Sequence, residues 1–241
     1  GTFAAAQKQL PRLKDLGIDI LWLMPIHPIG VDGRKGTLGS YYAIRDYKAI
    51  NPEFGTMEDF ENFLAEAHRL GLRVVIDCVA NHTSPDAVWT TDRAPEWYER
   101  NEKGETTYTA DWSDTANLNY DNKDVWQGMA DAMRFWMEKG VDGFRCDVID
   151  QISKDFVNNR NSFGPNLHKY INQLFGREKT KHIFTIGECW ARDIEEVCKH
   201  SKAERGELMA KHEFGIMDEN PQEHKRYDEY EPQKYNCISV S

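Results

Sequence analysis

Helix-type and strand-type patterns of apolar residues alternate along most of this chain. The helix-type segments, with apolar residues on one face, cover residues 3–16, 57–70, 123–139 and about 167–174. The strand-type segments are short apolar runs at residues 18–24, 72–79, 144–149 and 182–188, with a fifth strand expected within 208–217. Apolar strands that alternate with helices are typical of a parallel sheet covered by helices, so we expect these strands to be buried.

Two architectures have this alternation, a doubly wound open sheet and an eight-stranded barrel. Neither a G-x-G-x-x-G nor a G-x-x-x-x-G-K-[ST] motif opens a helix in the sequence. The nucleotide-binding form of the doubly wound sheet therefore has no support.

Residues 83–122 interrupt the alternation, because they are polar and aromatic and have no clear period. A connection of this length is uncommon in a compact domain unless it has a function. We therefore predict an insertion subdomain at residues 83–122, after the strand that ends at Val79. It separates two parts of one main domain, residues 1–82 and 123–241.

Charge and hydropathy exclude several classes of partner. The formal net charge is −10, and Lys and Arg form no stripe, which argues against nucleic acid and anionic membranes. The longest apolar runs are too short for a membrane-spanning helix. Aromatic residues make up 12% of the chain, which suits stacking on flat ligands such as sugar rings but equally suits core packing.

The five cysteines form no C-x-x-C pair and no zinc-type spacing with histidine. Their odd number and lack of pairing slightly favour a reducing compartment such as the cytoplasm. An extracellular location stays open, because a signal peptide is removable and would lie upstream of the chain.

Ionisable residues stand at or just after the ends of three predicted strands. They are Asp77 with the nearby His82, Arg145 with Asp147, and Glu188. In a parallel barrel the carboxyl ends of all strands open on one face, where active sites assemble. Each residue alone is explained as well by helix capping or a structural ion pair, but three coincident cases favour a polar cleft.

Three of these segments resemble the first three signature regions of the α-amylase family of glycoside hydrolases. They are residues 77–82 (DCVANH), 143–147 (GFRCD) and 187–188 (GE), with supporting similarity at 17–25, 46–47 and 51–56. The similarity covers nearly the whole chain in the family's order. It implies an α/β protein with a (β/α)8 TIM barrel that hydrolyses α-glucosidic bonds with retention of configuration.

By this resemblance, Asp147 is the catalytic nucleophile and Glu188 is the general acid/base. A retaining pair of this kind requires the two carboxyl groups to lie about 5–5.5 Å apart. Arg145 lies two residues from Asp147 on the same predicted strand, so both side chains are expected on one face, with the cation keeping Asp147 ionised. Phe184 and Trp190 would provide apolar surroundings for Glu188.

The resemblance also implies residues that bind the sugar. His82 would contact hydroxyl groups of the sugar that is cleaved, and Tyr42 would stack beneath it. Asp77 would hold the network around Arg145, and Trp190 is a further candidate for contact with substrate.

No cofactor is implied, and calcium is expected to be weak or absent. In many relatives the residue equivalent to Asn81 binds a structural calcium ion. Here Asn117 stands where such enzymes often carry Asp, and Asp150-Gln151 replaces a Lys-His pair. Calcium prefers six to eight oxygen ligands that include carboxylates.

The substrate signals conflict. Residues 148–149 and 163–168 resemble the oligo-1,6-glucosidase branch, whereas residues 39–42 resemble endo-acting bacterial amylases. Ala43 stands where the exo-acting branch usually has an Asp that binds the terminal sugar. We predict a hydrolase of α-glucans or short malto- or isomalto-oligosaccharides, with linkage open. The alternatives are a transglycosylase of the same family and a non-catalytic or inactive truncated member.

The chain is also expected to be a fragment of a longer domain. Four or five predicted strands do not close an eight-stranded barrel. The third carboxylate of the family, which belongs to an Asn-His-Asp motif, has no counterpart after Glu188.

Overall fold

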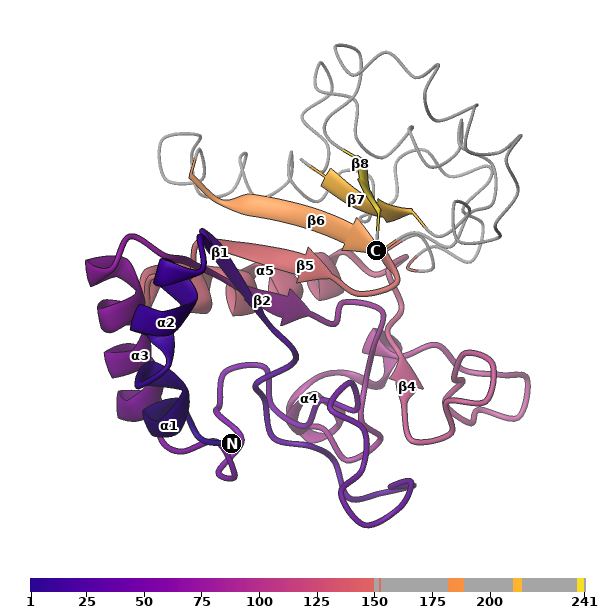
Figure 1. Ribbon diagram of the computed structural model, residues 1–241. Helices are drawn as coiled ribbons and strands as arrows, with labels where there is room; N and C mark the ends of the chain where they lie inside the picture. Colours follow the sequence, from indigo (N-terminus) through magenta and orange to yellow (C-terminus); the bar gives the residue numbers. More distant parts are fainter. Residues whose placement is uncertain (150–151, 153–181, 189–209, 214–237, 241) are drawn as a thin grey trace, which may run out of the picture. The chain divides into compact units, whose positions relative to one another are not determined.

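The computed structural model describes residues 1–149, 152, 182–188, 210–213 and 238–240. It divides into two compact units, residues 1–144 and 145–241, which are considered in turn. Figure 1 shows the helices and strands in chain order. Among the residues that the structure describes, no helix is both long and apolar enough to cross a membrane.

The chain begins with two short helices, α1 (Phe3–Gln7) and α2 (Leu10–Asp15). The prediction of one continuous helix over residues 3–16 is therefore wrong. Pro11 lies in the first turn of α2, where a residue without an N–H is tolerated. In a single longer helix Pro11 would be an interior residue and would break the hydrogen-bond ladder, so the chain starts a new helix instead.

Helix α3 (Met57–Arg69) begins and ends where the sequence predicts. Thr56 and Asp59 form a reciprocal capping box at its N-terminus, and hydrogen bonds from Thr56 hold the pKa of the Asp59 carboxyl below its usual value. Gly71 follows the helix with a φ of +73°, a conformation that glycine adopts without strain. The predicted apolar face is confirmed, since four of its residues are buried: Phe60, Phe63, Leu64 and Ala67.

Strands β1 (Ile20–Leu23) and β2 (Arg73–Cys78) pair in parallel, with Ile20 opposite Arg73 and Leu23 opposite Ile76. Strand β2 is buried from Val74 onward, as expected. The expectation of a buried strand at residues 18–24 is wrong, because Ile20 and Trp22 are each 46% exposed. An apolar run predicts a strand, whereas burial also needs neighbours on both faces. The described residues leave this face of β1 partly open.

Helix α5 (Lys123–Glu138) confirms the third helical pattern. Asn122 caps its N-terminus by accepting a hydrogen bond from the N–H of Asp124. The predicted face is buried, namely Val125, Met129, Met133 and Trp136. The indole N–H of Trp136 donates to the backbone carbonyl of Tyr47 at 2.7 Å, which joins α5 to the segment before α3.

The segment between β2 and α5 is largely irregular. It contains the short antiparallel pair β3 (His82–Thr83) and β4 (Ala116–Asn117), the helix α4 (Val88–Asp92) and the 3₁₀ turn Pro95–Trp97. Buried aromatic rings hold it together, with Trp89 packed 4.6 Å from Tyr47 and 5.2 Å from Trp97 between centroids. The division into residues 1–82, 83–122 and 123–241 stays a prediction.

Strand β5 (Gly143–Cys146) crosses the boundary between the two units. The second unit contains β6 (Phe184–Glu188), β7 (Ala210–Glu213) and β8 (Ile238–Val240), and β7 pairs in parallel with both of the others. Parallel pairing is thus confirmed in both units, whereas β8 had no signal in the sequence. The helix expected near residues 167–174 lies outside the described residues.

The third predicted strand, residues 144–149, is shorter than expected, because β5 ends at Cys146 and the chain turns at once. Val148 has a φ of +34°, which no β-strand accommodates. Cys146 and Cys78 are both buried.

Candidate active site

Strands β5 and β6 bring two carboxylates to one guanidinium group. Arg145 Nη1 donates to Asp147 Oδ1 at 2.7 Å, and Arg145 Nη2 lies 2.7 Å from Glu188 Oε2. All three side chains are at most 10% exposed. The expected contact between Arg145 and Asp147 is therefore confirmed, although Asp147 lies just beyond the strand rather than on it. Charged groups buried to this degree are held by their mutual pairing.

Glu188 is held by a second donor, the backbone N–H of Val148, which reaches Oε2 at 3.0 Å. This contact depends on the turn after β5, in which the φ of Val148 is +34°. Because Oε2 accepts from both the guanidinium and the backbone, a proton on this carboxyl group belongs on Oε1. The turn thus helps to orient the Glu188 carboxyl group.

Replacing Arg145 by Met removes the cation that bridges two buried carboxylates. We expect the free energy of unfolding to fall by about 3–5 kcal/mol, the usual effect of removing one partner from a buried ion pair. Urea unfolding followed by circular dichroism measures this loss. Arg145→Lys, the matched control, keeps the charge but not the planar fork, so it should retain more stability while failing to bridge both carboxylates. Equal stability of Arg145→Met and the wild type would contradict the assigned ion pair.

Asp77 lies at the end of β2 and is 1% exposed. The indole N–H of Trp22, on β1, donates to Asp77 Oδ2 at 3.1 Å. Trp22 is a residue that the sequence analysis missed, since only its place in an apolar run was evident and its polar role depends on a partner 55 residues away. The role of Asp77 around Arg145 stays a prediction.

His82 and Asn81 are both 2% exposed and contact each other. Asn81 Nδ2 lies 3.0 Å from His82 Nδ1, a contact in which the amide donates when Nδ1 carries no proton. The Tyr47 hydroxyl is shared between the carbonyls of Val79 and His82, at 2.6 and 2.8 Å. Trp112 packs against the imidazole with centroids 5.5 Å apart. Trp112 was not predicted as a site residue, because it lies in a segment without periodicity.

The remaining candidates are Tyr42 and Trp190. Tyr42 is half-buried in a turn, where its N–H donates to Ser40 Oγ at 3.2 Å and its carbonyl accepts from the N–H of Ile44. Its stacking beneath a sugar stays a prediction. Trp190 lies outside the described residues.

The surroundings of Asn81 do not fit a calcium site. The side-chain oxygen of Asn117 accepts from Thr109 Oγ1 at 3.1 Å, and Asn117 offers no carboxylate. In the part of the chain that the structure describes, no three His, Cys, Asp or Glu residues gather as metal ligands. Calcium requires several oxygen ligands with carboxylates among them, so no step of the chemistry is assigned to a metal here.

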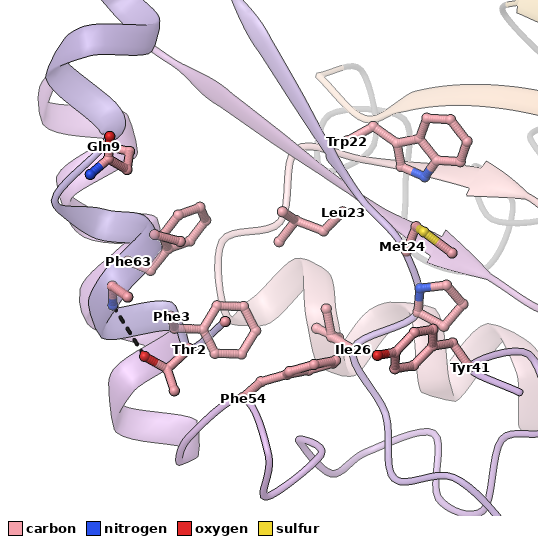
Figure 2. A pocket seen from close by; sticks show the side chains of 14 residues that line it. Thr2, Phe3, Gln9, Trp22, Leu23, Met24, Ile26, Tyr41, Phe54 and Phe63 are labelled. Atoms are coloured by element: carbon pink, nitrogen blue, oxygen red, sulfur yellow. Dashed lines mark hydrogen bonds between the residues drawn. The ribbon is translucent and has the colours of Figure 1, made fainter. Parts of the chain in front are cut away.

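A cavity of about 560 Å³ lies in the first unit, between the N-terminal helices and the exposed part of β1. Figure 2 shows its lining, in which Phe3 and Phe54 lie near Ile26 and the Tyr41 ring is 5.8 Å from Phe54. No acidic or basic side chain lines this cavity. It therefore holds no carboxylate pair of the kind that glycoside hydrolysis requires.

Two buried carboxylates, one just after β5 and one at the end of β6, thus contact one arginine in an α/β protein. A pair of carboxyl groups is also what most glycosidases use. Comparison with known proteins identifies the family. The sequence model of the family described as alpha amylase, catalytic domain, matches residues 1–112 and 93–240. The chain belongs to the α-amylase family, and the expected fold class, part of a (β/α)8 barrel, is confirmed.

Named relatives agree with this placement. The chain is 32% identical to the oligo-1,6-glucosidase of Bacillus cereus over 91% of this chain and 47% of that protein. It is 32% identical to the trehalose-6-phosphate hydrolase of Bacillus subtilis, over 83% of this chain and 42% of that protein. Among solved structures, an α-amylase from Lactobacillus plantarum aligns with a TM-score of 0.79 and 33% identity, over 98% of this chain and 58% of the other. The chain thus spans about half the length of the curated relatives it matches.

Proposed function

We propose that the protein is a retaining glycoside hydrolase that cleaves α-glucosidic bonds through a covalent glucosyl-enzyme intermediate. The observation that carries the proposal is the Arg145 guanidinium that joins Asp147 and Glu188. A retaining mechanism needs a nucleophile and an acid/base from two strand ends, about 5–5.5 Å apart. One planar cation that contacts both groups supports a separation of this order.

In the first step, an Asp147 oxygen attacks the anomeric carbon of the bound sugar. The glycosidic carbon–oxygen bond breaks, and the leaving oxygen takes the proton from Glu188. Arg145 keeps Asp147 ionised for the attack and donates to Glu188 Oε2, which directs the transferable proton to Oε1. The products are a glucosyl ester of Asp147 and a free sugar hydroxyl.

In the second step, Glu188 is ionised and acts as the base. It removes a proton from a water molecule whose oxygen attacks the anomeric carbon, and the bond to Asp147 breaks. Two displacements restore the original α configuration and return Glu188 to its protonated form. A sugar hydroxyl in place of water gives transfer instead of hydrolysis, which is the transglycosylase alternative.

The proposed substrates are short α-linked gluco-oligosaccharides. The named relatives include oligo-1,6-glucosidases, a glucan 1,6-alpha-glucosidase and a trehalose-6-phosphate hydrolase. Two of these names favour 1,6-linkages, and His82, Tyr42 and Asp77 are proposed to bind the sugar that is cleaved.

The test is product analysis by proton NMR during hydrolysis of isomaltose, isomaltotriose, maltotriose and an aryl α-glucoside by the full-length protein that carries this chain. We expect α-glucose to appear first and to convert slowly to the β-anomer. Initial release of β-glucose would overturn the retaining mechanism, and transfer products that outnumber glucose at low donor concentration would favour the transglycosylase.

A further inference from the structure

The loop at residues 109–115 carries Trp112 to the side of His82. The two ring centroids are 5.5 Å apart and the planes are tilted by 53°. His82 is 2% exposed, whereas Trp112 is half-buried and so partly accessible to solvent. A half-open aromatic ring beside a fixed polar ring is suited to packing on the apolar face of a sugar.

This loop is held in a conformation that it would not adopt alone. Ala110 has a φ of +49°, in the left-handed region that disfavours residues with a side chain. Trp112 is fixed on both sides, since its N–H donates to the Thr109 carbonyl and its own carbonyl accepts from the N–H and hydroxyl of Thr115, at 2.9 and 2.7 Å. Surrounding contacts must therefore stabilise the strained backbone.

Lys35, which lies on another loop, contacts the loop at residues 109–115. Its ammonium group donates to the Asp111 carbonyl and lies 3.7 Å from Asp114 Oδ1. Asp114 is 3% exposed, and within the part of the chain that the structure describes its other oxygen, Oδ2, has no hydrogen-bond partner. A buried carboxylate with so few partners depends strongly on its cation.

The two loops also meet through their backbones. Gly33 has a φ of +69°, and a Cβ atom added there would lie 2.9 Å from the Ser113 carbonyl oxygen. Only glycine permits this approach without displacing one loop. The close contact between the loop that contains Lys35 and the loop that contains Trp112 therefore depends on the glycine at position 33.

We propose that Lys35 is a positioning residue that latches the 109–115 loop, and that the latched Trp112 forms an aromatic wall of the site for an α-glucosyl unit beside His82. The proposal rests on the proposed function and deepens it, because it names a further sugar-binding residue and the contact that holds it in place. Loss of Trp112 removes the wall directly, whereas loss of Lys35 releases the loop that carries it.

The experiment measures KM and kcat for isomaltose and an aryl α-glucoside with Trp112→Leu, Lys35→Met and Lys35→Arg in the full-length protein. For Trp112→Leu we expect KM to rise about tenfold, the change expected from losing one aromatic contact, with kcat within about twofold of the wild type. Lys35→Met should raise KM in the same direction, and Lys35→Arg should restore it. The matched controls are Tyr108→Leu and Lys103→Met, exposed residues of the same segment that should leave KM unchanged.

A binding measurement guards against variants that fold poorly. Maltotriose should change the tryptophan fluorescence of the wild type, and Trp112→Phe should lose most of that change while unfolding at the wild-type temperature. Unchanged KM in Trp112→Leu would overturn the aromatic wall, and a KM effect in Trp112→Leu without one in Lys35→Met would overturn the latch. A wild type that releases no α-glucose would instead overturn the proposed function itself, which separates the two failures.

Discussion

Replacing Asp147 by Asn is expected to lower kcat by about 10⁴–10⁶-fold, the range seen when a nucleophile or its immediate partner is removed from a hydrolase. Asparagine keeps the size of the side chain and an oxygen for the contact from Arg145 Nη1, but an amide does not form the glucosyl ester. Turnover of an aryl α-glucoside under saturating conditions measures the loss.

Two measurements separate chemistry from folding for this variant. A fluorinated glucosyl donor that turns over slowly should add one glucosyl mass to the wild type, on the peptide that contains Asp147, and none to Asp147→Asn. Circular dichroism should show that Asp147→Asn is folded at the assay temperature, although the lost charge beside the buried Arg145 is expected to lower its unfolding temperature. Substantial residual turnover by a folded Asp147→Asn protein would assign the nucleophile elsewhere.

Replacing Glu188 by Gln has the second largest expected effect, a loss of about 10²–10⁴-fold in kcat for oligosaccharides, which is the usual contribution of a general acid or base. Glutamine still offers an oxygen to Arg145 Nη2 and to the Val148 N–H, so the local structure should persist. It has no proton to give to the leaving oxygen, and the reaction therefore slows most where that oxygen leaves poorly.

The leaving group provides the internal control for Glu188→Gln. The dinitrophenolate group of a 2,4-dinitrophenyl α-glucoside leaves without protonation. Glu188→Gln should therefore form the glucosyl intermediate from this substrate nearly as fast as the wild type does. The same loss for both classes of substrate would indicate that Glu188 acts on binding or folding rather than as the acid.

Local signals in the sequence predict the helices well. The Thr56 capping box, the glycine after α3 and the apolar face of α5 act over a few residues, and the structure has each of them where expected. The predictions that were wrong concern the first helix and the burial of β1. Pro11 divides the first helix, and the exposure of Ile20 depends on which groups lie beside β1, which an apolar run does not reveal.

In the candidate site, too, contacts between residues close in sequence were predictable, whereas contacts between distant residues were not. Arg145 and Asp147 are two residues apart, so alternation along a strand already predicts that they share a face. Glu188 required the family resemblance, because its partner Arg145 is distant in sequence and only the fold brings the two together. Trp112 and Trp22 were missed, since each acquires its role from a contact 30 or more residues away.

The backbone of Val148 stores strain at the position that orients Glu188. A β-branched residue with a φ of +34° is strained, by about 1–3 kcal/mol for a position of this kind. A glycine there would relieve the strain, but Val148 is 4% exposed, so the change would also remove a buried side chain and add entropy to the unfolded chain. The same change would loosen the turn that aims the N–H at Glu188 Oε2. Laboratory evolution of this protein is therefore expected to keep a side chain at position 148, whether heat resistance or turnover is screened.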